Sequence, residues 1–233
     1  MKKLVYLLLL SLSFSCGKEQ NELTVKGTVK GLQKGTLYLQ KAQDTLFVSV
    51  DSVQINGDPS FELHANIESP EVFYLVLDKN DSKEESIPFF ANNGVTEINT
   101  SLKNFVYDAK IKGSEQQKTW EDYQLMMSKF NNRNLEMLKE NLEAQRDGDS
   151  SKMINSQKQY DNLLKRKYLY TVNFAVNHKN SEVAPYLALT EVYNANIKLL
   201  DTINNVLTPE IKSSKYGKAL DSFIAEIKSK EQK

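Results

Sequence analysis

The spacing of the apolar residues changes near Gly113, and this change limits the chain to a β-rich part followed by a helical part. Between residues 23 and 112 apolar and polar residues alternate, and a period of two is typical of strands that bury one face. Asn56-Gly57-Asp58 and Asn93-Gly94 are tight-turn sequences between successive runs. The pattern predicts about eight strands, over residues 23–31, 36–40, 46–55, 61–65, 72–77, 87–90, 95–100 and 106–111.

The run Val72–Leu77 differs from the other runs because nearly all of its residues are apolar. Such a run is typical of a strand that is covered on both faces, so we expect it at the centre of a sheet. Many short strands with turn sequences between them favour a β-sandwich or a flattened barrel.

From Ser114 onward the apolar residues recur every three or four positions, which is the period of an α-helix. The first helix should run to Asp147-Gly148, and Asp149 or Ser150 can cap a second long helix that ends near His178. These two helices should form an antiparallel hairpin. The stripe of the first helix starts with Trp120, Tyr123, Met127 and Phe130 and drifts to Leu135, Leu138 and Leu142.

Three shorter helices should follow the hairpin: one capped by Ser181 with Pro185 in its first turn, one over 197–207, and one over 218–228. The predicted fold class is therefore α+β. An N-terminal antiparallel β-sandwich-like domain over residues 23–112 precedes an α-helical domain with a long helical hairpin over residues 113–228, and residues 229–233 form a charged tail.

Residues 1–15 have the pattern of a secretory signal peptide, with Lys2 and Lys3 before an apolar run. The run is about half as long as a helix that spans a bilayer. It leads to Cys16, the only cysteine of the chain, and this arrangement resembles a bacterial lipobox. The resemblance implies that residues 1–15 are removed, that Cys16 carries palmitate-type acyl chains, and that residues 16–22 are a lipidated tether. An ordinary signal peptide that leaves one free thiol is the alternative.

These features predict a protein of the cell envelope that a lipid anchors to the outer membrane, with the periplasmic and the surface face both open. The 30 Lys and Arg residues equal the 30 Asp and Glu residues in number. Because no basic patch with interleaved aromatic residues stands out, we do not expect a nucleic-acid partner. A single cysteine allows no internal disulfide, so the fold must depend on its apolar core.

One cluster offers oxygen ligands of the kind that calcium prefers: Asp78, Asn80, Asp81 and Glu84. It lacks the glycine and the terminal glutamate of an EF-hand loop, so a solvated loop is the stronger interpretation. We predict no metal and no cofactor. The two histidines, His64 and His178, fall on separate predicted elements, the polar face of a strand and the end of a helix. No catalytic motif occurs, so we do not expect an enzyme.

Two features of the helical part leave a binding role open. Lys165, Arg166 and Lys167 could contact anionic headgroups or an acidic partner, although a solvated helix face is the simpler interpretation. Aromatic residues could line a ligand groove, although their helical spacing favours core packing. These aromatic residues are Trp120, Tyr123, Phe130, Tyr160, Tyr168, Tyr170 and Phe174.

Several short motifs resemble one family, the N-terminal region, of unknown function, of Bacteroidota lipoproteins that usually precedes a TlpA/ResA-type thioredoxin-like thiol-disulfide oxidoreductase domain. They are the lipobox cysteine, Val25–Val29, Asn56–Phe61, the Pro70-led strand, Asn92–Ile98, Gly113-Ser114, Ser181–Tyr193 and Lys215-Tyr216-Gly217. The family's redox domain needs an attacking and a resolving cysteine. Since the sequence holds only Cys16, we expect that this chain alone does not exchange disulfides.

We therefore expect a membrane-anchored, non-enzymatic binding or interaction module, with a thioredoxin-like or other envelope protein as its partner. The alternative is an accessory part of a split thioredoxin-like system that selects a substrate or partner. A calcium-stabilised structural lipoprotein is a third hypothesis.

Overall fold

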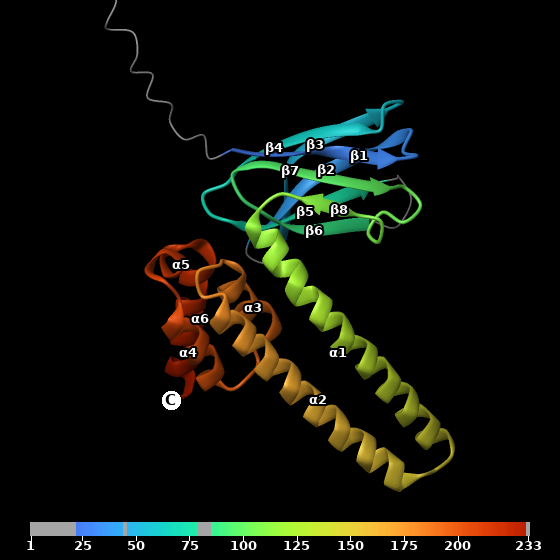
Figure 1. Cartoon of the computed structure of the whole chain (residues 1–233), viewed down its shortest axis with the longest axis vertical. Helices are drawn as coiled ribbons and strands as arrows, with labels where there is room; N and C mark the ends of the chain where they lie inside the picture. Colours follow the sequence, from blue (N-terminus) through green and yellow to red (C-terminus); the bar gives the residue numbers. More distant parts are fainter. Residues whose placement is uncertain (1–21, 44–45, 79–84, 232–233) are drawn as a thin grey trace, which may run out of the picture.

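The computed structural model describes residues 22–43, 46–78 and 85–231, with a β-rich part at one end and helices at the other (Figure 1). The predicted α+β class is confirmed, since the described residues form eight strands and then six helices. The strands are β1 (Glu22–Lys30), β2 (Lys34–Gln43), β3 (Leu46–Asn56), β4 (Ser60–Asn66), β5 (Glu71–Asp78), β6 (Glu85–Ala91), β7 (Gly94–Ser101) and β8 (Lys110–Lys112). The helices are α1 (Glu115–Arg146), α2 (Ser150–Asn177), α3 (Val183–Glu191), α4 (Ile197–Val206), α5 (Pro209–Ser213) and α6 (Lys215–Glu231).

The strands form two four-stranded sheets, in the orders β4-β1-β7-β8 and β3-β2-β5-β6. Their pairs are antiparallel, as predicted, with one exception: β1 and β7 run parallel, with Gly27 opposite Ile98. A parallel pair needs a long connection instead of a tight turn. The alternation of apolar residues within each strand does not reveal which distant strand lies beside it, so this pair could not be predicted from periodicity.

Both sheets contribute to one apolar core. β5 lies between β2 and β6, and its second face carries Val72 and Val76, which are also buried. This confirms the prediction that the strand is central and covered on both faces. In β1 and β5 the core residues are Leu23, Val25, Val29, Phe73, Leu75 and Leu77.

The last predicted strand, 106–111, is wrong in its first half. Only Lys110–Lys112 pairs with β7, and the residues before it form a turn that buries Phe105. The hydroxyl of Thr100 donates a hydrogen bond to the Phe105 carbonyl oxygen at 2.6 Å. This bond and the burial of Phe105 hold the turn, whereas Tyr107 is almost fully exposed.

The long hairpin forms where it was predicted, with Asp149 as the cap of its second helix. Ser114 accepts a hydrogen bond from the backbone N–H of Gln117 at 3.1 Å, and Asp149 accepts one from Lys152 at 3.0 Å. Both bonds satisfy donors that have no partner inside a helix. Gly148 between the helices has a φ of 69°, which glycine adopts at little cost.

The last helix is longer than the predicted 218–228. α6 starts at Lys215 because the Ser214 hydroxyl accepts a hydrogen bond from the Gly217 N–H at 3.2 Å. It continues to Glu231, so residues 229–231, which we predicted in the charged tail, are helical.

One interface joins the sheets to the helices. Phe90 of β6 contacts Trp120 edge-on, with ring centroids 5.9 Å apart, and the Phe90 N–H donates to the side chain of Gln117 at 2.7 Å. Nearby, the Val72 N–H donates to the Tyr216 hydroxyl at 3.0 Å, and the buried Glu71 carboxylate pairs with Lys215. These contacts fix the base of the hairpin on the sheet, and its far half projects away from both parts (Figure 1).

Candidate functional site

The hairpin has a packed base and an open far half. At the base, Tyr123 is buried and its hydroxyl hydrogen-bonds that of Thr171 at 2.8 Å, and burial raises the pKa of this tyrosine. None of the three apolar clusters of the fold includes a residue between 131 and 167, all of which the structure describes. The far halves of α1 and α2 therefore contribute no residue to the apolar clusters that hold the rest of the fold.

Three leucines of α1 form an exposed stripe on this far half. Leu135, Leu138 and Leu142 are 62%, 53% and 55% exposed. Because successive helical residues are rotated by about 100°, the three lie within about 60° of one another. Met137 and Ala144, which are buried, lie on the opposite side. The stripe that drifts along α1 in the sequence thus leaves the helix interface and faces solvent.

Four depressions follow one another from the hairpin turn towards its base. The first, about 380 Å³, lies on the leucine stripe between Leu135 and Arg146. The second, about 280 Å³, shares Leu138 with the first, and the third, about 110 Å³, shares Asn134 and Tyr160 with the second. The fourth, about 570 Å³, shares Leu164 with the third. We call this series of neighbouring depressions the hairpin furrow.

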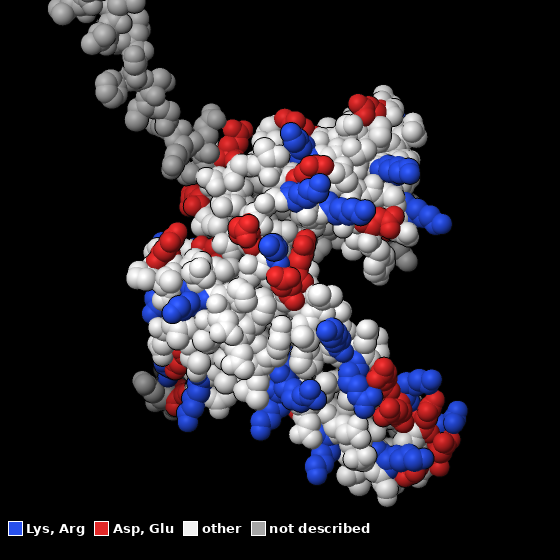
Figure 2. Space-filling model, viewed as in Figure 1, with Lys and Arg blue, Asp and Glu red and all other residues white. Residues whose placement is uncertain are grey.

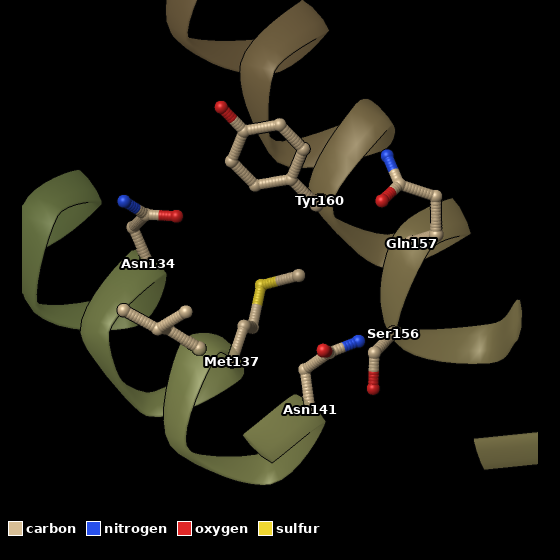
Figure 3. Close-up of a pocket in the computed structure, with 7 residues that line it drawn as sticks. Asn134, Met137, Asn141, Ser156, Gln157 and Tyr160 are labelled. Carbon is tan, nitrogen blue, oxygen red and sulfur yellow. The ribbon is translucent and has the colours of Figure 1, made fainter. Parts of the chain in front are cut away.

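The second depression shows how the furrow is built (Figure 3). Met137 reaches from α1 into the space between the helices and forms an apolar floor, while the amides of Asn141 and Gln157 line the edges from either helix. Both amides are already engaged within their own helices: Gln145 donates to Asn141, and Gln157 donates to Asp161 at 3.0 Å.

The fourth depression lies between α2 and the turn that leads into α4. Its walls are mostly apolar, with Leu164, Leu169 and Leu199 among them. The Tyr168 hydroxyl donates to the side-chain oxygen of Asn194 at 2.7 Å and so ties this turn to α2.

The charged residues that line the furrow are mostly basic. Five cations line it, against the two carboxylates of Glu143 and Asp161. Two of the cations have a neighbouring carboxylate: Arg146 contacts Asp147 at 3.0 Å, and Lys167 contacts Glu191 at 2.9 Å. Charged side chains of both signs crowd the end of the hairpin (Figure 2). The five cations are Lys139, Arg146, Lys165, Lys167 and Lys198.

The two interpretations of the aromatic residues each hold for a different part of the hairpin. Trp120 and Tyr123 are buried at the base, as core packing predicts. Tyr160 and Tyr168 line the furrow. The leucine stripe was missed as a surface, and its signal was the drift in spacing after Phe130.

The other predicted site residues do not come together. Cys16, Asn80, Asp81 and Glu84 lie outside the described residues, and Asp78 ends β5. Within the described part of the chain, no three His, Cys, Asp or Glu side chains are close enough to hold a metal ion. No helix in that part has the length and apolar character needed to cross a membrane.

The two histidines occupy separate elements, as predicted. His64 of β4 lies 3.3 Å from Glu62 and 3.6 Å from Glu22, on an exposed face. His178 ends α2, where its Nδ1 lies 2.8 Å from the Phe174 carbonyl oxygen and its ring stacks on that of Phe174.

Comparison with known proteins identifies the first part of the chain. Residues 23–120 match a family described as Domain of unknown function (DUF4369). No curated protein matches the chain. The matched region covers all eight strands and ends at Trp120, in the first turns of α1, so the hairpin furrow lies outside it. The β-sandwich and the start of α1 thus match a domain whose family description gives its function as unknown.

Proposed function

We propose that the protein is an envelope-anchored lipoprotein and a non-enzymatic interaction module, which captures a partner protein in the hairpin furrow. The observation that carries the proposal is the leucine stripe, three leucines that are more than half exposed and line the first depression of the hairpin furrow. Contiguous apolar surface of this kind is expensive to leave in water, and on soluble proteins it marks sites of interaction.

The position of the furrow supports this role. β1 begins at Glu22, and the hairpin turn lies at the far end of the molecule from the β part (Figure 1). A lipid on Cys16 would be six residues from β1, a reach of roughly 20 Å. An anchor of this length would hold the β part near the outer membrane and leave the hairpin turn pointing away from it, where another envelope protein can approach.

The test compares two exposed leucines of α1. Leu138→Asp places a charge in the furrow, whereas Leu125→Asp places one at a position that is 66% exposed and lines none of the four depressions. Partners are cross-linked in the native envelope, purified with the full-length protein and identified by mass spectrometry. We expect a protein that is recovered with the wild type and with Leu125→Asp and lost with Leu138→Asp.

The identity of the captured protein separates two roles. A thioredoxin-like protein would make the module an accessory part of a split redox system, and a protein without thiols would make it an independent binding lipoprotein. Equal recovery with both leucine variants would contradict a role for the furrow.

A further inference from the structure

We propose that the furrow binds an amphipathic α-helix of the partner protein, with acidic residues beside the apolar stripe of that helix. This inference rests on the function proposed above and specifies the chemistry of the partner. It follows from three properties of the furrow: the spacing of its apolar residues, the state of its hydrogen-bonding groups, and its charge.

The apolar residues favour a helix that lies along the hairpin. Leu135, Leu138 and Leu142 are spaced as one face of a helix, and Leu164 and Leu199 line the fourth depression. Helices pack by placing ridges of side chains into grooves between side chains. A partner helix with apolar residues at positions i, i+3, i+4 and i+7 would present the matching ridge.

The hydrogen-bonding groups argue against an extended segment. Outside the turn at 194–196, the walls of the furrow are helical side chains, and the backbone groups of α1 and α2 are used within the helices. The amides of Asn141 and Gln157 are engaged by Gln145 and Asp161. An extended peptide in the furrow would leave its own N–H and C=O groups without partners, whereas a helix satisfies these groups internally.

The charge of the furrow selects an acidic helix. Arg146 and Lys167 already pair with Asp147 and Glu191, so three lysines remain against the two carboxylates of the furrow. This excess of positive charge favours a partner with Asp or Glu beside its apolar stripe. The same count disfavours a second copy of this chain, since two facing furrows would bring their cations together. Within the described part of the chain, Lys139, Lys165 and Lys198 form no ion pair. Their ammonium groups can therefore face an incoming carboxylate.

The probe is a pair of synthetic helical peptides of about five turns, with leucines at i, i+3, i+4 and i+7 and either glutamates or lysines beside the leucines. Binding to the purified full-length protein is followed by fluorescence anisotropy at low salt. We expect the glutamate peptide to bind at least ~10-fold more tightly than the lysine peptide and to weaken as salt is raised.

Charge reversal provides the matched control. Lys139→Glu with Lys165→Glu should remove or invert the preference for the glutamate peptide. Lys118→Glu with Lys129→Glu changes the same net charge at exposed positions of α1 outside the furrow, and it should leave the preference unchanged. Circular dichroism should show all variants folded.

Three results would overturn the inference: equal or tighter binding of the lysine peptide, equal binding of a glutamate peptide whose leucines are scrambled, or self-association of the protein through the furrow in sedimentation. The leucine comparison in the envelope separates this failure from a failure of the proposed function. A partner lost with Leu138→Asp would keep the furrow as a binding site even if the partner is not an acidic helix.

Discussion

Two glycines occupy positions where the neighbouring backbone leaves no space for a side chain. A Cβ on Gly27 of β1 would overlap the carbonyl oxygen of Ile98 in the parallel strand β7. A Cβ on Gly217 of α6 would overlap the carbonyl oxygen of Ile211 in α5. Both glycines belong to the short motifs on which the family resemblance rests, so these motifs have a structural cause in the close approach of two backbones.

Gly217→Ala should therefore destabilise the protein. The added methyl group must push α5 and α6 apart, which costs about 1–3 kcal/mol of unfolding free energy. Urea unfolding measures the change. Ser222→Ala, at an exposed position of the same helix, is the control and should change the unfolding free energy by less than about 0.5 kcal/mol. An unchanged urea midpoint for Gly217→Ala would mean that the two helices are not in close contact.

Glu182 makes the stability of the protein depend on pH. Its carboxylate is buried and accepts a hydrogen bond from the Ser214 hydroxyl at 2.6 Å. Burial is the main cause that raises its pKa from 4.5 to about 7. The hydrogen bond from Ser214 lowers the pKa by a smaller amount, and the negative charge of Glu210 raises it further. The folded state therefore favours the protonated form. This stabilisation is fully present below pH 4.5 and is lost as the pH rises through about 7.

Glu182→Gln should remove this pH dependence. Glutamine keeps an acceptor for Ser214 but cannot ionise, so the variant should be more stable than the wild type at pH 8 by roughly 1–3 kcal/mol and similar to it near pH 5. Urea unfolding across this range measures the difference. Glu68→Gln, at an exposed residue, should follow the wild type. A wild-type stability that does not fall between pH 5 and pH 8 would exclude a raised pKa for Glu182.

Cys16→Ser tests the proposed lipid anchor. Removal of the thiol prevents acylation, and each buried methylene of an acyl chain contributes about 0.8 kcal/mol to membrane binding. The variant should move from the detergent phase to the aqueous phase in a Triton X-114 partition. Wild-type protein labelled with an alkynyl palmitate is the positive control. Partition into detergent by the Ser variant would contradict anchoring through Cys16.

The two halves of the hairpin differ: the base packs on the rest of the fold, and the far half carries the proposed binding surface. The base contributes Trp120, Tyr123 and Met127 to the interface with the sheet. The far half contributes to no apolar cluster outside itself, and it carries the leucine stripe. The stability of the rest of the fold therefore does not require a hairpin of this length. A long hairpin is what a surface that reaches a partner needs.

Replacement of residues 134–161 by a short glycine-rich turn should leave the rest of the protein folded. None of the removed residues belongs to an apolar cluster of the fold, so the unfolding temperature should change by less than about 5 °C. Scanning calorimetry measures this temperature, and partner recovery should be lost. A much larger decrease of the unfolding temperature would show that the far half stabilises the base.

Elements with strong local signals were predictable, and pairings between distant residues were not. Ser114 and Asp149 cap α1 and α2 because an N-cap depends on bonds within one helical turn. The parallel pairing of β1 with β7 depends on strands far apart in the sequence, which their periodicity does not encode. The prediction of a strand from residue 106 is wrong because the apolar residues there alternate as in a strand. The chain forms a turn instead, since tertiary packing buries Phe105.

The aromatic interface between the sheet and the helices sets the direction of the hairpin. Phe90, Trp120, Tyr186 and Tyr216 pack edge-on or tilted against one another, with centroids between 5.2 and 6.1 Å apart. Such pairs fix orientation as well as bury area. The aromatic residues that build this interface come from β6, α1, α3 and α6, so its existence could not be inferred from any one stretch of sequence.

The furrow was only partly predictable for the same reason. Its leucines, tyrosines and lysines could each be assigned to a helix from the sequence, and Lys165 was weighed as a contact for an acidic partner. Whether Leu138 faces the core or solvent depends on how far the rest of the fold extends along α1. That distance is a property of the whole molecule, and helical spacing alone favours burial.

Photo-cross-linking in living cells, with a photoreactive amino acid at single positions of the full-length protein, tests whether the hairpin binds one partner through the furrow. Positions 138, 142 and 164 lie in the furrow, and position 125 is the exposed control on α1. The furrow positions should all give an adduct with the same protein, and position 125 should give none. Adducts of equal yield at position 125, or different proteins at each furrow position, would contradict a specific binding surface on the hairpin.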